Sequence, residues 1–185
     1  FSSFKNRTLR VQGRLTSTFP SAEKGMLTYQ VSDSKGRVVL KKKERITCKP
    51  ATSDFSSLLQ FDSSVLPWDE YTPNLYQLKL SYQFGDCQGQ QVVQFGFRDL
   101  ESVEGKLLLN GYTLFLRGEH DPGSFPLTGY PSMEKSEWLR IFMTGKEYGL
   151  NHWRFHSWCP PEAAFAAADE VGIYLQPELP LFSQN

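Results

Sequence analysis

The side chains best suited to chemistry gather late in the chain, around one short apolar run. In residues 150–155 the side chains alternate between two faces, so His152 and Arg154 share one face, and His156 follows just past the end. Trp153 and Phe155 take the other face. Two imidazoles and a guanidinium are costly to place inside a sheet without polar partners. We therefore expect this row to bind something, or to be paired with carboxylates.

Candidate partners end or follow the neighbouring strands. Glu178 follows the third predicted strand, and the run Glu119-His120-Asp121 follows the first. A substrate-binding site is one interpretation, and an Arg154–Glu178 pair that only stabilises the fold is another. A metal site built from His152 and His156 is disfavoured, because ~3.3 Å per residue would set them about 13 Å apart along a strand.

Trp158 lies just beyond the same strand and also has two interpretations. An indole is a good platform for the C–H face of a sugar, which favours a carbohydrate site. A core tryptophan explains the residue equally well.

The surrounding pattern alternates strands with helices. A hairpin is expected around Asn110-Gly111, the strongest two-residue turn signal. Strand–helix–strand–helix–strand order predicts parallel βαβ units, in which function lies at the carboxyl ends of the strands. The expected elements are hairpin strands 106–109 and 112–116, a helix 133–148 with Ser132 as N-cap and Gly149 at C′, a strand 150–155, a helix opened by Pro160-Pro161 and closed by Gly172, and a strand 173–176.

Residues 8–98 show a different pattern. Short runs of alternating apolar residues recur about every ten residues, and turn sequences such as Asp33-Ser34-Lys35-Gly36 and Gly85-Asp86 separate them. About seven strands predict an immunoglobulin-like β-sandwich. We interpret the cluster 41–45 as a solvated strand face or as protection of a sheet edge.

Charge divides the chain at the same place. The whole chain has 20 Lys+Arg and 20 Asp+Glu, but residues 1–98 hold 14 against 8 and residues 99–185 hold 6 against 12. All three histidines lie in the second part. The sequence contains no apolar run long enough to span a membrane and no basic block typical of nucleic-acid binding apart from Lys41-Lys42-Lys43. We therefore expect no membrane and no nucleic-acid partner.

The three cysteines, Cys48, Cys87 and Cys159, are widely spaced and show no zinc-binding pattern. We interpret them as free thiols and expect no metal and no cofactor. The N-terminal residues do not resemble a signal peptide, although a mature exported protein would look the same. A periplasmic or secreted location is the working hypothesis.

Several segments, in this order, resemble glycoside hydrolase family 2, the group of β-galactosidases, β-glucuronidases and β-mannosidases. They are Trp68 with Pro73–Leu78, Phe95–Arg98, Leu109-Asn110-Gly111 with Leu116-Arg117-Gly118, Lys146–Asn151, Arg154, and Asp169–Tyr174. The resemblance implies an all-β immunoglobulin-like sandwich over 1–98, followed over 99–185 by the first part, about three βα units, of a (β/α)8 TIM barrel.

The resemblance also implies roles for particular residues. Arg154 matches the arginine after the second barrel strand, and Glu178 matches the acidic residue that ends the third. His120 lies near a histidine that lines the pocket in many members. Most relatives read Arg-x-Ser-His-Tyr-Pro where this chain has Arg154-Phe155-His156-Ser157-Trp158, so His156 stands one position early. The expected substrate-binding residues are His120, Arg154, His156, Trp158 and Glu178.

Members of this family are retaining glycosidases, and their two catalytic glutamates come from the fourth and seventh barrel strands. A barrel needs about 250 residues, so we expect this chain to be a fragment that lacks both glutamates and is inactive alone. Its partner would be an oligosaccharide or glycoside, and its exposed sheet edges would favour association with other chains or homo-oligomers. The alternative is a non-catalytic carbohydrate-binding or scaffold module. A nucleotide-binding domain is disfavoured by the absence of phosphate-loop motifs.

Overall fold

A computed structural model describes residues 1–180 of the chain and shows two compact units. The first unit comprises Phe1–Pro67 and Asn74–Leu100, and the second comprises Trp68–Pro73 and Glu101–Asn185. The main division thus falls close to residue 98. The six-residue segment 68–73 lies within the sandwich part of the sequence but makes its contacts in the second unit.

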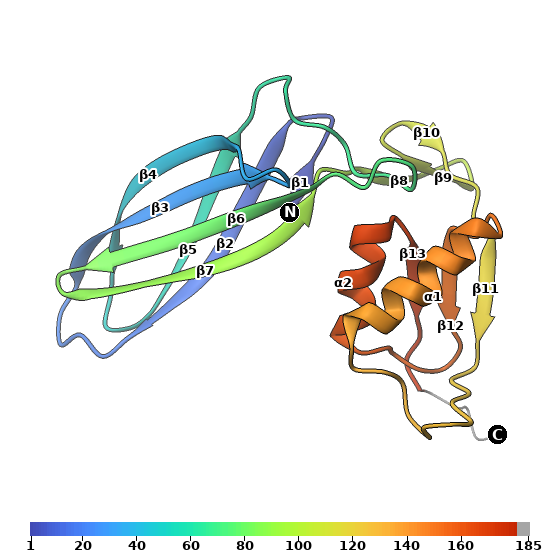
Figure 1. Cartoon of the computed structure of the whole chain (residues 1–185). Helices are drawn as coiled ribbons and strands as arrows, with labels where there is room; N and C mark the ends of the chain where they lie inside the picture. Colours follow the sequence, from blue (N-terminus) through green and yellow to red (C-terminus); the bar gives the residue numbers. More distant parts are fainter. Residues whose placement is uncertain (181–185) are drawn as a thin grey trace. The chain divides into compact units, whose positions relative to one another are not determined.

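The first unit is a β-sandwich of two antiparallel sheets (Figure 1). One sheet has the order β1-β2-β5 and the other β4-β3-β6-β7. Apolar side chains from alternating positions fill the space between the sheets, as period-2 patterning requires. The strands are β1 (Ser2–Ser3), β2 (Thr8–Ser17), β3 (Glu23–Asp33), β4 (Val38–Cys48), β5 (Ala51–Gln60), β6 (Leu75–Phe84) and β7 (Cys87–Gly96). The predicted sandwich is therefore confirmed, and Cys48, Cys87 and Cys159 are free thiols as expected.

A small antiparallel sheet of order β10-β9-β8 begins the second stretch of chain. It contains β8 (Leu100–Val103), β9 (Lys106–Leu109) and β10 (Tyr112–Thr113). Asn110 and Gly111 have φ values of 52° and 87°, which is the left-handed backbone that a two-residue type I′ hairpin requires. The hairpin prediction is confirmed, although its second strand is shorter than expected.

The second unit contains three parallel strands with a helix in each crossover. The elements are β11 (Gly118–Asp121), α1 (Lys135–Glu147), β12 (His152–Phe155), α2 (Glu162–Val171) and β13 (Tyr174–Pro177). The sheet order is β11-β12-β13, with every pair parallel. Over residues 1–180 these strands form an open sheet and not a closed barrel.

Both helices pack on one face of this sheet (Figure 1). The core between them is formed by Trp138 and Phe142 of α1, Trp153 and Phe155 of β12, the small face of α2, and Ile173. Three alanines, Ala164, Ala167 and Ala168, let α2 approach the sheet closely. The alternation within β12 therefore puts its aromatic side chains under the helices and its polar side chains on the opposite face.

The helix ends agree only in part with the sequence. Gly149 is at C′ as predicted, with φ 81°; it donates its N–H to the carbonyl of Lys146, while Leu150 donates to Gly145, which together form a Schellman motif. The N-cap of α1 is Glu134, so the prediction of Ser132 is wrong. The Ser132 hydroxyl instead accepts the N–H of Glu134 at 3.1 Å, because Ser132 lies two residues before the N-cap.

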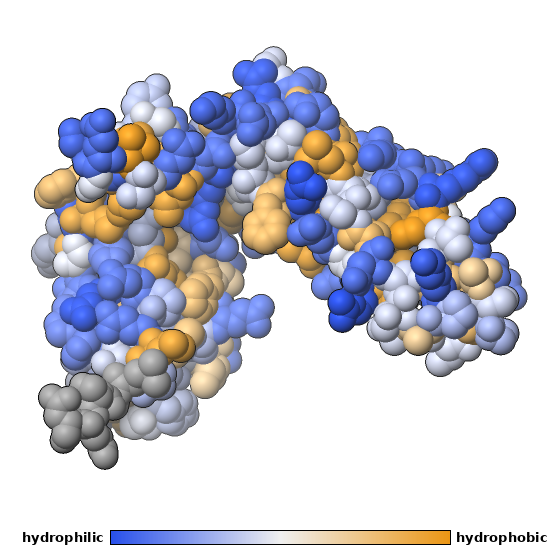
Figure 2. All heavy atoms as spheres, turned by 180° about the vertical axis from the view of Figure 1, so that it is seen from behind, coloured by the Kyte–Doolittle hydropathy of each residue, from blue (hydrophilic) through white to orange (hydrophobic). Residues whose placement is uncertain are grey.

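Apolar side chains are also exposed in small patches among hydrophilic ones (Figure 2). Leu127 is 97% exposed and Phe115 is 72% exposed. Neither helix is long and apolar enough for a bilayer span within the part of the chain that the structure describes.

Candidate functional site

The strand register builds a polar row across the three-stranded sheet. His120 of β11 pairs with Arg154 of β12, and Arg154 pairs with Gln176 of β13. Because neighbours in register point the same way, these three side chains share the face that the helices leave open. Gly118, His152 and Tyr174 form the preceding row of the same face.

At the carboxyl ends of the strands, Arg154 is paired with Glu178. The guanidinium Nε donates to Glu178 Oε1 at 2.7 Å, and the two side chains are 41% and 25% exposed. The other carboxylate oxygen accepts the backbone N–H of Ser157 at 3.0 Å. Ser157 has φ 63°, a backbone conformation that costs energy for a residue with a side chain and that aims this N–H at Glu178.

These contacts fix the charge of Glu178. The hydrogen bond from Arg154, followed by that from the Ser157 N–H, lowers the pKa of the carboxyl below its ordinary 4.5. Glu178 is therefore an ionised hydrogen-bond acceptor at neutral pH and not a proton donor. Arg154 keeps its two terminal nitrogens without a hydrogen bond to any of residues 1–180, so they can serve a ligand.

Two exposed imidazoles lie beside this pair. The rings of His120 and His156 are 5.0 Å apart and nearly perpendicular. The backbone N–H of His156 donates to the Asp121 carbonyl at 2.9 Å. This bond holds the residue after β12 beside the last residue of β11. The third imidazole, His152, lies deeper in the same face, and burial lowers its pKa below 6.5. A Cβ on Gly118 would lie 2.6 Å from His152 Nδ1, so glycine leaves the space that this ring occupies.

Trp158 is held firmly at the edge of this group. Its Nε1 donates to the Asp121 carbonyl at 3.0 Å, and its ring lies 4.8 Å from Phe155 and 5.5 Å from Phe125 in edge-to-face contacts. The backbone N–H of Glu178 donates to the Trp158 carbonyl at 3.2 Å. The half-buried indole thus packs against the core on the helix side of the sheet and also contacts the ends of the strands that carry Arg154 and Glu178.

The five predicted residues therefore come together, but the first strand differs from expectation. The parallel strand is residues 118–121 and not 112–116, so His120 is inside a strand and not in a loop after it. Glu119 and Asp121 pair with Trp153 and Phe155, which places them on the helix-side face. Neither can therefore act as the carboxylate partner that the sequence suggested for the row. Among residues 1–180 no cluster of three or more potential ligands is arranged to hold a metal ion.

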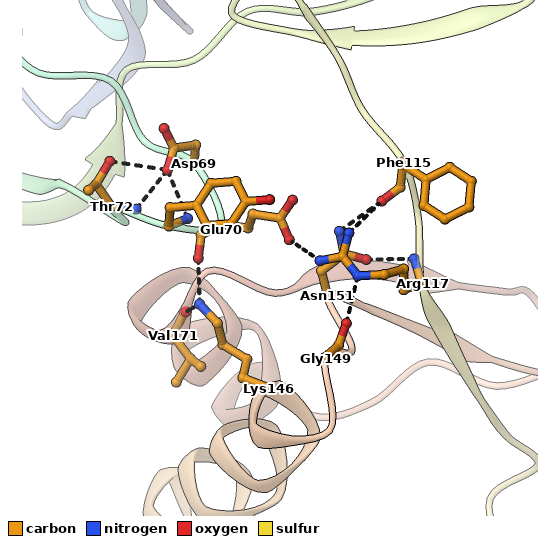
Figure 3. A network of polar contacts seen from close by, with 10 residues as sticks. Asp69, Glu70, Thr72, Phe115, Arg117, Lys146, Gly149, Asn151 and Val171 are labelled. Carbon is orange, nitrogen blue, oxygen red and sulfur yellow. Dashed lines mark hydrogen bonds and ion pairs between the residues drawn. The ribbon is translucent and has the colours of Figure 1, made fainter.

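A polar network that no sequence pattern predicts lies at the other end of the sheet (Figure 3). Arg117 Nη2 donates to Glu70 at 2.9 Å, and its Nε donates to the Gly149 carbonyl at 2.6 Å. The fully buried Asn151 accepts the Arg117 N–H at 2.7 Å and donates to the Phe115 carbonyl at 2.9 Å. These bonds fix where β11 and β12 begin and hence where His120 and Arg154 stand.

Segment 68–73 is tied to the helices by the same network. Lys146 donates to the carbonyls of Glu70 and Val171, the latter at 2.8 Å (Figure 3). Trp68 Nε1 donates to the Asp169 carbonyl at 2.7 Å. A Cβ on Gly172 would meet the Glu70 backbone at 3.0 Å, so the closing glycine of α2 also makes room for this segment. An Asp-Glu pair in a loop carries no pattern that predicts such contacts.

The chain thus combines an antiparallel sandwich with parallel βαβ units, and its polar group lies at the carboxyl ends of the parallel strands, the end at which βα barrels place their sites. Solved structures with this fold include a glycosyl hydrolase family 2 member from Bacteroides cellulosilyticus, with TM-score 0.81, 22% identity and coverage of 93% of this chain and 22% of that one. A Bacteroides uniformis β-glucuronidase gives TM-score 0.79 at 22% identity, with coverage of 94% and 21%.

The model of the family described as glycosyl hydrolases family 2 matches residues 2–98, and the chain belongs to that family. Similar curated proteins include a β-galactosidase of Thermoanaerobacterium thermosulfurigenes, 24% identical over 82% of this chain and 21% of its own length. Another is a β-galactosidase of Lactobacillus delbrueckii subsp. bulgaricus, 25% identical over 99% of this chain and 17% of its own length. The chain therefore spans about a fifth of the relatives that it matches.

Proposed function

We propose that this chain supplies the β-sandwich and the first βα units of the catalytic barrel of a retaining, exo-acting glycoside hydrolase that cleaves O-glycosidic bonds. The supporting observation is the group formed by His120, Arg154, His156 and Glu178 at the carboxyl ends of parallel strands. In barrel enzymes this is the end at which substrates bind. Membership of family 2 supports glycoside chemistry.

The proposed task of these residues is to bind and orient a sugar. Glu178 is ionised and accepts hydrogen bonds from Arg154, the Ser157 N–H and Gln176, so it holds the guanidinium of Arg154 in one orientation. The terminal nitrogens of Arg154 then present donors to a hydroxyl or ring oxygen. The exposed imidazoles of His120 and His156 add groups that can donate or accept, and Trp158 borders the site with an indole.

Hydrolysis itself is assigned to other carboxyl groups. A retaining mechanism needs an acid/base and a nucleophile about 5–5.5 Å apart. Glu178 is committed to Arg154 with a lowered pKa, and Glu119 lies on the opposite face of the sheet, so the two do not form such a pair. We therefore expect no glycosidase activity from these 185 residues alone.

The test compares the 185-residue chain with the product of the complete reading frame, on a panel of aryl β-galactosides, β-glucuronides and β-mannosides. The complete product should hydrolyse at least one of them with retention of the anomeric configuration, observed by proton NMR, while the short chain should give no turnover. Turnover by the short chain that Glu178→Gln abolishes would contradict the assignment of roles. A complete product that binds sugars but hydrolyses none of them would favour a carbohydrate-binding module.

A further inference from the structure

The outer face of the four-stranded sandwich sheet carries positive charge without any carboxylate. Alternation along β4 puts Lys41, Lys43 and Arg45 on this face, while Lys42 and Glu44 point to the other side. The register adds cations from the neighbouring strands. The five are Lys24, Lys41, Lys43, Arg45 and Lys79. Within β3, β4, β6 and β7, which lie side by side in Figure 1, no Asp or Glu takes an outward position between these cations.

The remaining outward positions are rich in side-chain amides and hydroxyls. Rows across the sheet read Lys41–Gln30–Lys79 and Lys43–Thr28–Ser81. The glutamines that share the face are Gln30, Gln77, Gln83, Gln88, Gln90 and Gln94. Amides and hydroxyls both donate and accept hydrogen bonds, which suits the hydroxyl groups of a sugar.

The same face is hollowed at two neighbouring places. One hollow, of 530 Å³, is lined by Lys43, Ser81 and Gln90, and the other, of 650 Å³, by Lys24, Arg45 and Thr47. Met26 and Gln83 line both, so the two hollows adjoin. Together they extend along β3 from Lys24 to Thr28, about 13 Å at ~3.3 Å per residue, with cations along this length.

We propose that this surface, the outward face of β4-β3-β6-β7, binds a carboxylated polysaccharide such as a polyuronate. The cations match the repeated carboxylates of the chain, and the amides match its hydroxyls. A single-stranded nucleic acid fits less well, because no aromatic residue takes an outward position on these strands, and the one aromatic residue that lines a hollow, Tyr82, packs against the sandwich core. One exposed carboxylate lies at the edge of this surface within these four strands and the β6–β7 turn. It is Asp86, in that turn.

The surface goes beyond the proposed glycosidase function and is tested by binding alone, so either idea can fail without the other. Isothermal titration calorimetry with the 185-residue chain and oligogalacturonate should show binding that is lost at about 0.5 M sodium chloride, where screening leaves only contacts within about 4 Å. A neutral glucan of equal length should not bind.

Two pairs of substitutions locate the contact. Lys43→Gln with Arg45→Gln, and separately Lys41→Gln with Lys79→Gln, should each weaken binding roughly tenfold. Lys5→Gln with Arg10→Gln removes the same charge elsewhere on the sandwich and should leave the affinity unchanged. All three variants change exposed side chains, and circular dichroism checks that each is folded.

Three outcomes would overturn the proposal. They are no binding of oligogalacturonate, equal weakening by the control pair, and tighter binding of a single-stranded DNA of the same charge. The last result would identify a general polyanion surface and not a polysaccharide site.

Discussion

The substitution Gly145→Ala tests how α1 holds the strand that carries Arg154. Gly145 is buried in α1, and a Cβ there would lie 2.5 Å from Trp153 Cζ3 and 2.7 Å from Cη2. In an exposed helix, replacing glycine by alanine stabilises by about 1 kcal/mol. Here the added methyl group meets an indole that is only 7% exposed and lies 5.3 Å from the Phe142 ring, so the indole has little room to move.

Overpacking of this kind costs up to about 3 kcal/mol, which exceeds the gain in helix propensity. We expect a net destabilisation of about 2 kcal/mol. All four tryptophans lie in the second unit, so intrinsic fluorescence during urea unfolding reports on this unit. The midpoint should fall by about 1 M for a slope near 2 kcal/mol per M.

The neighbouring position provides the control. Thr144 is exposed in the same helix, and its hydroxyl donates to the Arg140 carbonyl one turn back, a contact that adds little to helix stability, so Thr144→Ala should raise the midpoint slightly through helix propensity. If Gly145→Ala raises the midpoint as Thr144→Ala does, the close packing of α1 on β12 is wrong.

Three further predictions concern the ionisable groups. Burial lowers the pKa of His152 below 6.5, so the folded chain binds fewer protons near that pH than the unfolded chain does. Stability, measured as the midpoint of urea unfolding, should therefore fall as the pH drops through 6.5. His152→Asn should make the midpoint depend less on pH in this range. The pKa of Glu178 is lowered below 4.5, so the Arg154 contact should contribute stability above that pH and lose it as the pH falls through the lowered value, which carboxyl carbon NMR can follow. Lys146→Met removes the donors to Glu70 and Val171 and should cost about 1–3 kcal/mol in urea unfolding, whereas Lys106→Met should cost little.

Local patterns predicted most of the secondary structure. Period-2 alternation in the first hundred residues predicts the sandwich, because the face of each strand that points between the two sheets must be apolar. Asn110-Gly111 and Gly149 gave the hairpin and the end of α1, because few residues adopt positive φ. The first parallel strand was misplaced because residues 118–121 are Gly, Glu, His and Asp, which carry no apolar alternation.

The polar residues that the sequence predicted to meet do lie near one another, although His120 lies within a strand and not after one. Strand order alone predicts that the groups after parallel strands meet, and Arg154 does meet Glu178. The role of Ser157 could not be predicted, because it depends on a single backbone conformation. The contacts of Glu70 could not be predicted either, because its partners Arg117 and Lys146 are separated from it by 47 and 76 positions in the sequence. Likewise, the sequence of 41–45 predicts a solvated strand face or the protection of a sheet edge, and β4 is an edge strand. The cations that share its outward face from β3 and β6 are known only from the register.

The most direct test of the proposed function is the kcat/KM of the complete reading-frame product with Arg154→Lys. Lysine keeps the charge but lacks the planar, rigid fork that bonds Glu178 through Nε while its terminal nitrogens face a sugar oxygen, so we predict a loss of about 10- to 100-fold on the best aryl glycoside. Arg140→Lys, in the exposed pair with Glu137, is the matched control and should leave kcat/KM unchanged. Equal kcat/KM values for wild type and Arg154→Lys would contradict a substrate-binding role for this face of the sheet.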